Sequence, residues 1–253
     1  MTTPPRRGIH LSLPLSLAAL LAWLLLTISG RWLGDGGAPA SLTAAVAGGI
    51  GLPWLLAAAF SVALALALRE RAALGLNLPQ PLKTTWLAWP PLLYSLLLLL
   101  VAWAGGWPPR PVLLIVACNT VLVAVSEELM FRAILLQGLL DRWAQWPAVL
   151  ACSALFGLAH TVNGLATGDV GGALWQAVAA FLQGICYAAI RLRTRSIWPM
   201  VVVHALWDFA LVTATLSAAA EGEGSVLPFA ALLAVLPLCL YGVFLLRNRN
   251  RNG

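Results

Sequence analysis

Runs of apolar residues alternate with short polar segments along the whole chain. The runs are close to the ~20 residues that an α-helix needs to cross a bilayer. Leu, Ala and Val dominate them, and they lack the sustained alternation of apolar and polar residues that is typical of barrel strands. The pattern therefore predicts an all-α, polytopic membrane helix bundle with about eight transmembrane helices, at Leu11–Ser29, Thr43–Leu68, Thr85–Ala104, Pro111–Leu140, Pro147–Thr161, Leu174–Ile190, Ile197–Leu216 and Val226–Leu246.

The composition agrees with this fold class. Hydrophobic residues make up 61% of the chain and charged residues 9%, and the mean hydropathy is +0.89, which excludes an ordinary soluble domain. The connecting segments are short, and the longest, Thr161–Gly172, is expected to be a flexible loop. We therefore expect residues 1–253 to form a single integral-membrane domain. The first run also resembles a signal peptide, but it exceeds the roughly 7–15 apolar residues typical of one, which favours a retained anchor.

Basic residues predict the orientation of the bundle, because they accumulate in the cytoplasmic loops of membrane proteins. With eight spans and a cytoplasmic N-terminus, Arg31 and Arg110 fall outside, and Arg132 lies within a span. The twelve basic residues that fall inside are Arg6, Arg7, Arg69, Arg71, Lys83, Arg142, Arg191, Arg193, Arg195, Arg247, Arg249 and Arg251. We expect both termini to be cytoplasmic. The compact loops and the lack of an organelle signal favour a bacterial inner membrane.

The positive net charge of +6 is explained by this topology. No basic stripe with interleaved aromatic residues indicates nucleic-acid binding. The expected surroundings are the lipid bilayer, with no nucleic acid as a partner.

Three of the predicted spans contain ionisable side chains, which are costly in lipid and mark functional sites. They are Glu127, Glu128 and Arg132 in the fourth span, His160 in the fifth, and His204 and Asp208 in the seventh. At about 1.5 Å per residue, both glutamates lie roughly 20 Å from the end of their helix near Asp141, and His160 lies about as deep in the antiparallel fifth span. His204 is roughly 12 Å deep by the same measure. We expect these side chains to meet in one site.

The spacing within each helix predicts pairs, since residues four apart share a face. Glu128 and Arg132 are placed as an ion pair, and His204 and Asp208 project together. Glu127 is rotated by about 100° from Glu128 and has no local partner, so it is the carboxylate free for chemistry. A purely structural ion pair, and histidines that only link helices, are the alternative interpretation.

Three short motifs carry a family resemblance. EELMFR at 127–132 matches EExxxR, FGLAH at 156–160 matches FxxxH, and HALWD at 204–208 matches HxxxN/D. In this order they resemble the CPBP family of intramembrane proteases, which includes the type II CAAX prenyl endopeptidases and bacterial proteins linked to bacteriocin processing or self-immunity. The resemblance extends from about Val112 to Ala210, a protease-like motif core at 112–210.

The resemblance implies an intramembrane endopeptidase that hydrolyses membrane-anchored proteins or peptides. Such chemistry needs an activated water and donors for the oxyanion. The catalytic residues that it implies are Glu127 and His160 to activate water, Glu128, and His204 with Asp208 on the electrophilic side, supported by Arg132 and Phe156. Eukaryotic relatives typically have Asn at the position of Asp208, and an Asn amide can donate a hydrogen bond whereas an ionised Asp only accepts.

Two further questions stay open at the level of sequence. Glu127, Glu128, His160 and His204 are all permissible zinc ligands. However, there is no HExxH pair, and the resemblance favours glutamate-activated water without metal or other cofactor. The alternative functions are a catalytically silent immunity or scaffold protein and a proton-coupled transporter with a midplane Glu/His site; the sequence lacks the repeats and paired broken helices that favour a transporter.

Overall fold

The computed structural model describes residues 8–32, 41–69, 71–220 and 227–249. In these ranges the chain folds into helices, and none of the described residues forms a β-strand. In chain order the helices are α1 (Leu13–Trp32), α2 (Leu42–Ala47), α3 (Leu52–Ala67), η1 (Leu82–Ala88), α4 (Trp89–Ala104), α5 (Arg110–Glu127), η2 (Glu128–Leu135), α6 (Leu136–Leu140), α7 (Gln145–His160), α8 (Val162–Thr167), α9 (Val170–Thr194), α10 (Trp198–Ala220) and α11 (Leu227–Arg249).

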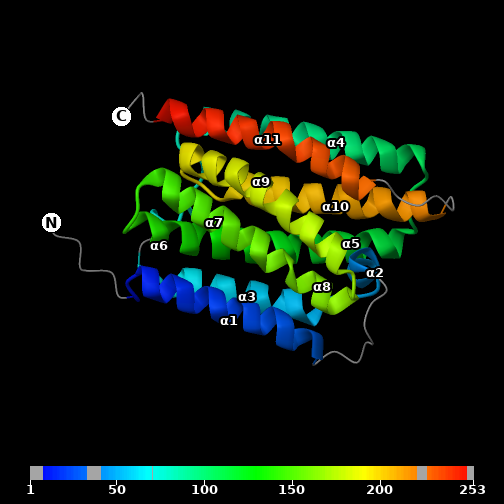
Figure 1. Ribbon diagram of the computed structural model, residues 1–253, viewed down its shortest axis with the longest axis horizontal. Helices are drawn as coiled ribbons and strands as arrows, with labels where there is room; N and C mark the ends of the chain where they lie inside the picture. The colour runs from blue at the N-terminus through cyan, green and yellow to red at the C-terminus, as the bar shows by residue number, and fades with distance from the viewer. Residues whose placement is uncertain (1–7, 33–40, 70, 221–226, 250–253) are drawn as a thin grey trace.

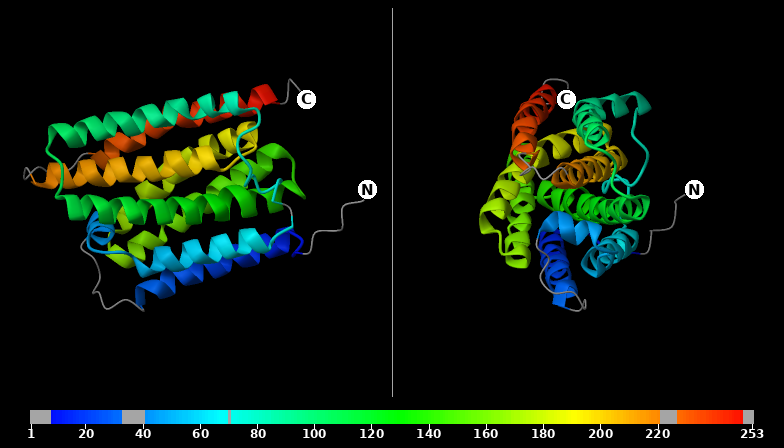
Figure 2. Two further views of the ribbon diagram at one scale, coloured as in Figure 1. Left: turned by 180° about the vertical axis from the view of Figure 1, so that it is seen from behind. Right: turned by 90° about the vertical axis from the view of Figure 1, so that its right-hand side faces the viewer.

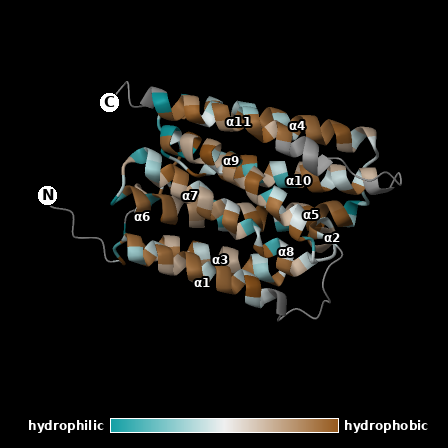
Figure 3. Ribbon diagram, in the orientation of Figure 1, coloured by the Kyte–Doolittle hydropathy of each residue, from teal (hydrophilic) through white to brown (hydrophobic). Residues whose placement is uncertain are grey.

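The predicted membrane bundle is confirmed. Six helical segments are long and apolar enough to cross a bilayer, and α3 and the segment Leu233–Arg247 of α11 are shorter apolar helices. Together they account for the eight predicted runs. Large apolar side chains such as Leu114, Leu240 and Leu100 are exposed on the outside of the bundle, and Figure 3 shows hydrophobic residues along the length of the helices. This protein is an integral membrane protein, with side chains that can face lipid.

The helices pack side by side, with α1 and α3 at one edge of the bundle and α4 and α11 at the opposite edge (Figures 1 and 2). Between them, α9 packs against both α7 and α11, and α10 packs against α4 and α5. α5 also contacts α3. The three helices that bear the motifs therefore lie between these two edges, and α1 and α3 pack against the part of the chain that carries the first motif.

The second predicted span is not continuous, which corrects the expectation for Thr43–Leu68. The helix stops after α2 and restarts at α3. The buried side chain of Asn119 in α5 forms hydrogen bonds with the backbone at this break. Its Nδ2 donates to the carbonyls of Val46 (2.8 Å) and Gly49 (2.7 Å), and its Oδ1 accepts from the amide of Gly51 (3.1 Å). Backbone without helical bonds is tolerated at membrane depth where protein groups satisfy it. One buried amide side chain therefore stabilises the break.

The fourth predicted span is a helix throughout, but its middle part changes type. From Glu128 to Leu135 it is a π-helix, and the amide of Leu136 donates to the carbonyl of Phe131, five residues earlier. Such segments are rare in proteins, and those that occur are often found at functional sites. Nothing in the hydrophobic pattern indicated the change, which covers most of the first motif.

The expectation of a flexible loop at Thr161–Gly172 is wrong in part, because the segment contains the helix α8. Gly168, at a φ of 75°, ends α8, and the Oδ1 of Asp169 caps α9 by accepting from the amide of Gly172 at 2.8 Å. The Nδ2 of Asn163 in α8 donates to the Oε1 of Gln176 in α9 at 2.8 Å. α8 is therefore fixed against α9, directly after the helix that carries His160.

Some sequence predictions fall on parts that lie outside the described residues. These are Arg6, Arg7, Arg251, Val226 at the start of the last predicted span, and the side chains of Arg31 and Arg249.

Candidate active site

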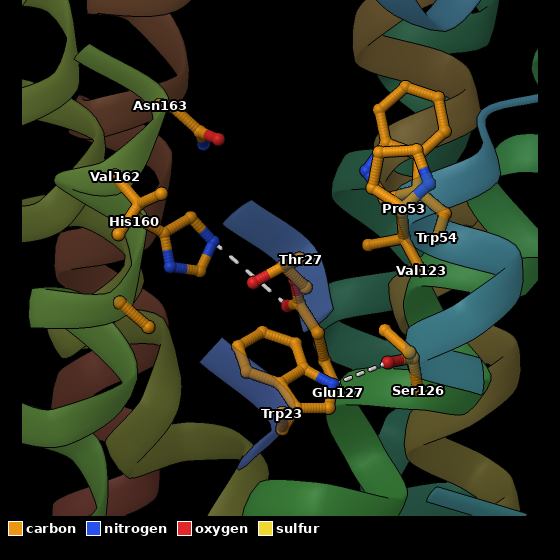
Figure 4. Close-up of a pocket in the computed structure, with 12 residues that line it drawn as sticks. Trp23, Thr27, Pro53, Trp54, Val123, Ser126, Glu127, His160, Val162 and Asn163 are labelled. Atoms are coloured by element: carbon orange, nitrogen blue, oxygen red, sulfur yellow. Dashed lines mark hydrogen bonds and ion pairs between the residues drawn. The ribbon is translucent and has the colours of Figure 1, made fainter. Parts of the chain in front are cut away.

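Glu127, the last residue of α5, lies between the two motif histidines. Its Oε2 is 3.7 Å from the Nε2 of His204 and 4.0 Å from the Nε2 of His160. Figure 4 shows the Glu127 carboxylate facing His160 across this gap. Oε2 forms no hydrogen bond with any described residue. Both separations exceed a direct hydrogen bond, and such gaps suit a bridging water.

Glu128 is fully buried and points to the other side of the same group. Its Oε1 accepts a hydrogen bond from the Nδ1 of His204 at 2.9 Å and lies 3.5 Å from the Nη1 of Arg132. The ion pair expected from the four-residue spacing is thus present. The bond to His204 was not expected, because residue spacing within one helix says nothing about contacts between α5 and α10. Glu128 links two of the three motifs.

Arg132 is 1% exposed and lies among aromatic rings. Its Cζ is 3.9 Å from the ring centre of Phe156 and 5.5 Å from that of Tyr187. Within the described part of the chain its guanidinium nitrogens form no hydrogen bond. The charge of Glu128 and the faces of these rings are therefore what compensates the buried cation.

Phe156 holds the two histidines as well as the arginine. Its ring lies edge-on to His160, with centres 4.7 Å apart, and to His204 at 6.2 Å. The Nδ1 of His160 is bonded to the carbonyl of Phe156 at 2.8 Å, which leaves Nε2 directed towards Glu127. The first residue of the second motif thus fixes the orientation of the last one.

Asp208 is the most exposed member of the group, at 30%. Its Oδ2 lies 3.4 Å from the Nε2 of His204, one helical turn earlier. His204 therefore has a carboxylate at each ring nitrogen: Glu128 at Nδ1, and both Glu127 and Asp208 near Nε2.

A cavity of about 50 Å³ adjoins Glu127 and His160 (Figure 4). α1, α3, α5, α7 and α8 contribute its lining. Trp23 of α1 is part of the wall, and its Nε1 donates to the Oγ of Ser126 at 2.7 Å. Sequence reasoning missed the residues of α1 and α3 here, because tryptophans in apolar runs look like any lipid-facing aromatic residue.

The four possible zinc ligands come from the three motifs. The structure brings Glu127, Glu128, His160 and His204 together. Among the described residues, however, no three His, Cys, Asp or Glu side chains are arranged to hold one metal ion. We therefore derive no step through a metal.

Comparison with known proteins adds one match. No curated protein and no solved structure matches the chain. Residues 109–210 match the family described as type II CAAX prenyl endopeptidase Rce1-like. This range contains all three motifs and the helices α5 to α10 up to Ala210, and it agrees with the extent of the resemblance drawn from the motifs. The match agrees with the CPBP resemblance: residues 109–210 of this chain are similar to the Rce1-like, type II CAAX prenyl endopeptidase family.

Proposed function

We propose that this protein is an intramembrane endopeptidase that hydrolyses membrane-anchored proteins or peptides with water activated by Glu127 and His160. The carrying observation is the unbonded Oε2 of Glu127, which faces the Nε2 atoms of two histidines at 3.7 Å and 4.0 Å beside a cavity. A carboxylate without a protein donor is free to accept a proton from water. The family match supports a membrane protease.

In this mechanism His160, on one side of Glu127, helps to hold the attacking water, and His204, on the other side, stabilises the oxyanion. Water between Glu127 and His160 gives its proton to the carboxylate as its oxygen attacks the peptide carbonyl. The carbonyl oxygen becomes an oxyanion, which the protonated Nε2 of His204 stabilises by donating a hydrogen bond. The tetrahedral intermediate then breaks its C–N bond, and Glu127 passes the proton to the leaving amine. The products are a carboxylic acid and an amine, and Glu127 is regenerated.

Glu128 and Asp208 act through His204 in this scheme. The bond from Nδ1 to Glu128 fixes which nitrogen is directed into the site. Asp208, whose Oδ2 is 3.4 Å from Nε2, limits the rotation of the imidazole. Only a protonated Asp208 could itself donate to an oxyanion, so this scheme assigns that role to His204.

Asp208→Asn is expected to keep substantial activity, because Asn reaches the same position and can accept from His204 or donate to the oxyanion. If Asp208 instead were an obligatory metal ligand, the variant would be inactive. Peptide cleavage by the purified variant and zinc content of the purified wild-type protein decide this together. Stoichiometric zinc that is lost in Asp208→Asn or Glu127→Gln would contradict the metal-free mechanism.

The substrate can be found by comparing the membrane proteomes of cells that contain the wild-type protein or Glu127→Ala. We expect a membrane-anchored peptide, or the transmembrane tail of a protein, that loses its cleaved form with the variant. A cleavage pattern identical in both strains would contradict the proposal and favour a silent immunity or scaffold protein.

We also propose that both termini are cytoplasmic, in a bacterial inner membrane. Two hydrogen bonds bring connections that contain basic residues together at one end of the bundle. The amide of Gln80 donates to the carbonyl of Thr194, and the Nε2 of Gln145 donates to the carbonyl of Leu246. The start of α1 and the end of α11 are at this same end (Figure 1). A phosphatase reporter fused after Gly253 should be inactive and a cytoplasmic reporter active. The opposite result would invert the topology.

A further inference from the structure

The cavity beside Glu127 has two unlike sides. His160 and Asn163 lie on one side, and Pro53, Trp54 and Val123 lie on the other, with Glu127 between them (Figure 4). The wall formed by α3 and α5 is mostly apolar, with Ser126 as its polar member, at the place where an attacking water and a substrate carbonyl have to meet. A substrate bound across Glu127 must place one of the side chains that flank the scissile bond against this wall.

The cavity is small for that purpose. Its volume of about 50 Å³ is roughly a third of the ~150 Å³ that a buried apolar site needs to hold benzene. It has room for a few water molecules or for a side chain of similarly few heavy atoms. A leucine or phenylalanine side chain does not fit without displacing the wall.

Trp54 is held in place by the break in the second span. If Gly51 carried a Cβ, that atom would stand 2.1 Å from the Cε3 of Trp54, so the indole lies directly on the Gly51 backbone. The amide of Gly51 is in turn bonded to the buried Asn119 of α5, the helix that ends at Glu127. The indole is therefore positioned relative to the catalytic helix rather than free to turn aside.

Resting on the proposed function, we infer that this cavity is the pocket for one substrate side chain next to the scissile bond, and that Trp54 closes it to all but small residues. The substrates are then membrane peptides with Gly, Ala or Ser at that position. Trp54 is a specificity-determining residue. It lies outside the three motifs and outside residues 109–210, so this selectivity is a property of the N-terminal part of the chain.

The test uses the purified full-length protein in detergent and a peptide library made by digesting a bacterial membrane proteome. Mass spectrometry of the cleaved products identifies the residues on both sides of each new terminus, and Glu127→Gln gives the background. At one flanking position the wild-type protein should prefer Ala over Leu or Phe by about 10-fold or more, since even one methylene changes selectivity by about 10–200-fold in an apolar pocket.

Two variants of Trp54 test whether this residue causes the preference for small side chains. Trp54→Ala should reduce the preference for small residues by roughly 10-fold and yield products with Leu or Phe at that position. Trp54→Phe, which keeps a ring against Gly51, should give an intermediate change and remains informative if the Ala variant does not fold. Trp103→Ala, which removes an exposed indole from α4, should cleave like the wild-type protein.

The outcomes separate the inference from the function on which it rests. Cleavage that tolerates Leu and Phe equally at both flanking positions would overturn the pocket while leaving the protease intact. An unchanged preference in both Trp54 variants would remove Trp54 from the explanation and also overturn the inference. If wild-type and Glu127→Gln proteins produce the same peptides, the proposed function itself is wrong.

Discussion

Glu127→Gln is expected to lower the rate of peptide cleavage by about 10²–10⁴-fold, the usual contribution of a general base. Gln has the shape of Glu, but its amide cannot accept the proton of the attacking water. Because Oε2 of Glu127 has no hydrogen bond to any described residue, the exchange breaks no hydrogen bond at that atom. The measurement is the single-turnover cleavage rate of a peptide identified from the library, with the thermal stability of the variant followed in parallel.

Asp141→Asn is the matched control, since Asp141 is an exposed carboxylate after the end of α6. It should retain full activity. An active Glu127→Gln protein would contradict the assignment of the general base, and with it the protease mechanism built on that residue.

Arg132→Met is expected to destabilise the folded protein by about 3–5 kcal/mol, because it leaves Glu128 buried without its cation. Glu128 is fully buried, and it then keeps the hydrogen bond from the Nδ1 of His204. Thermal or denaturant unfolding of the protein in detergent measures the loss. The double variant Glu128→Gln with Arg132→Met should recover part of it, since removing both charges is less costly than removing one.

Arg142→Met is the control for this change. Arg142 lies 3.6 Å from Asp141, but both side chains are exposed, and such pairs contribute about 0–1 kcal/mol. Equal losses for Arg132→Met and Arg142→Met would show that the buried pair adds nothing beyond an exposed one.

The hydrophobic pattern was sufficient for the bundle, because the bilayer sets both the length and the composition of a spanning helix. It was also sufficient to expect that Glu127, His160 and His204 meet, since residues at similar depth on neighbouring helices can share one site. The roles of these residues remain predictions. Their distances from one another were open in the sequence and come only from the fold.

The features that the sequence missed depend on contacts between helices. The break before α3 exists because Asn119, 68 residues away from Gly51, satisfies its backbone. The π-helical segment after Glu127 is a change of hydrogen-bond partner that leaves the apolar pattern intact. The cavity wall combines Trp23 and Trp54 from two runs that resemble ordinary lipid anchors. In each case the local sequence is compatible with a plain helix, and tertiary contacts decide otherwise.

We expect the break before α3 to have a consequence for the lipid around the protein. With 16 residues, α3 is about 24 Å long, some 6 Å less than the ~30 Å hydrocarbon core of a typical bilayer. A short apolar helix is accommodated by local thinning of the bilayer, at a fraction of a kcal/mol per Å of mismatch. We therefore expect acyl chains to be compressed beside α3, which brings headgroup water nearer to the face that holds Pro53 and Trp54. For a hydrolase, whose second reactant is water, a thin membrane next to its site shortens the path from which that reactant is supplied.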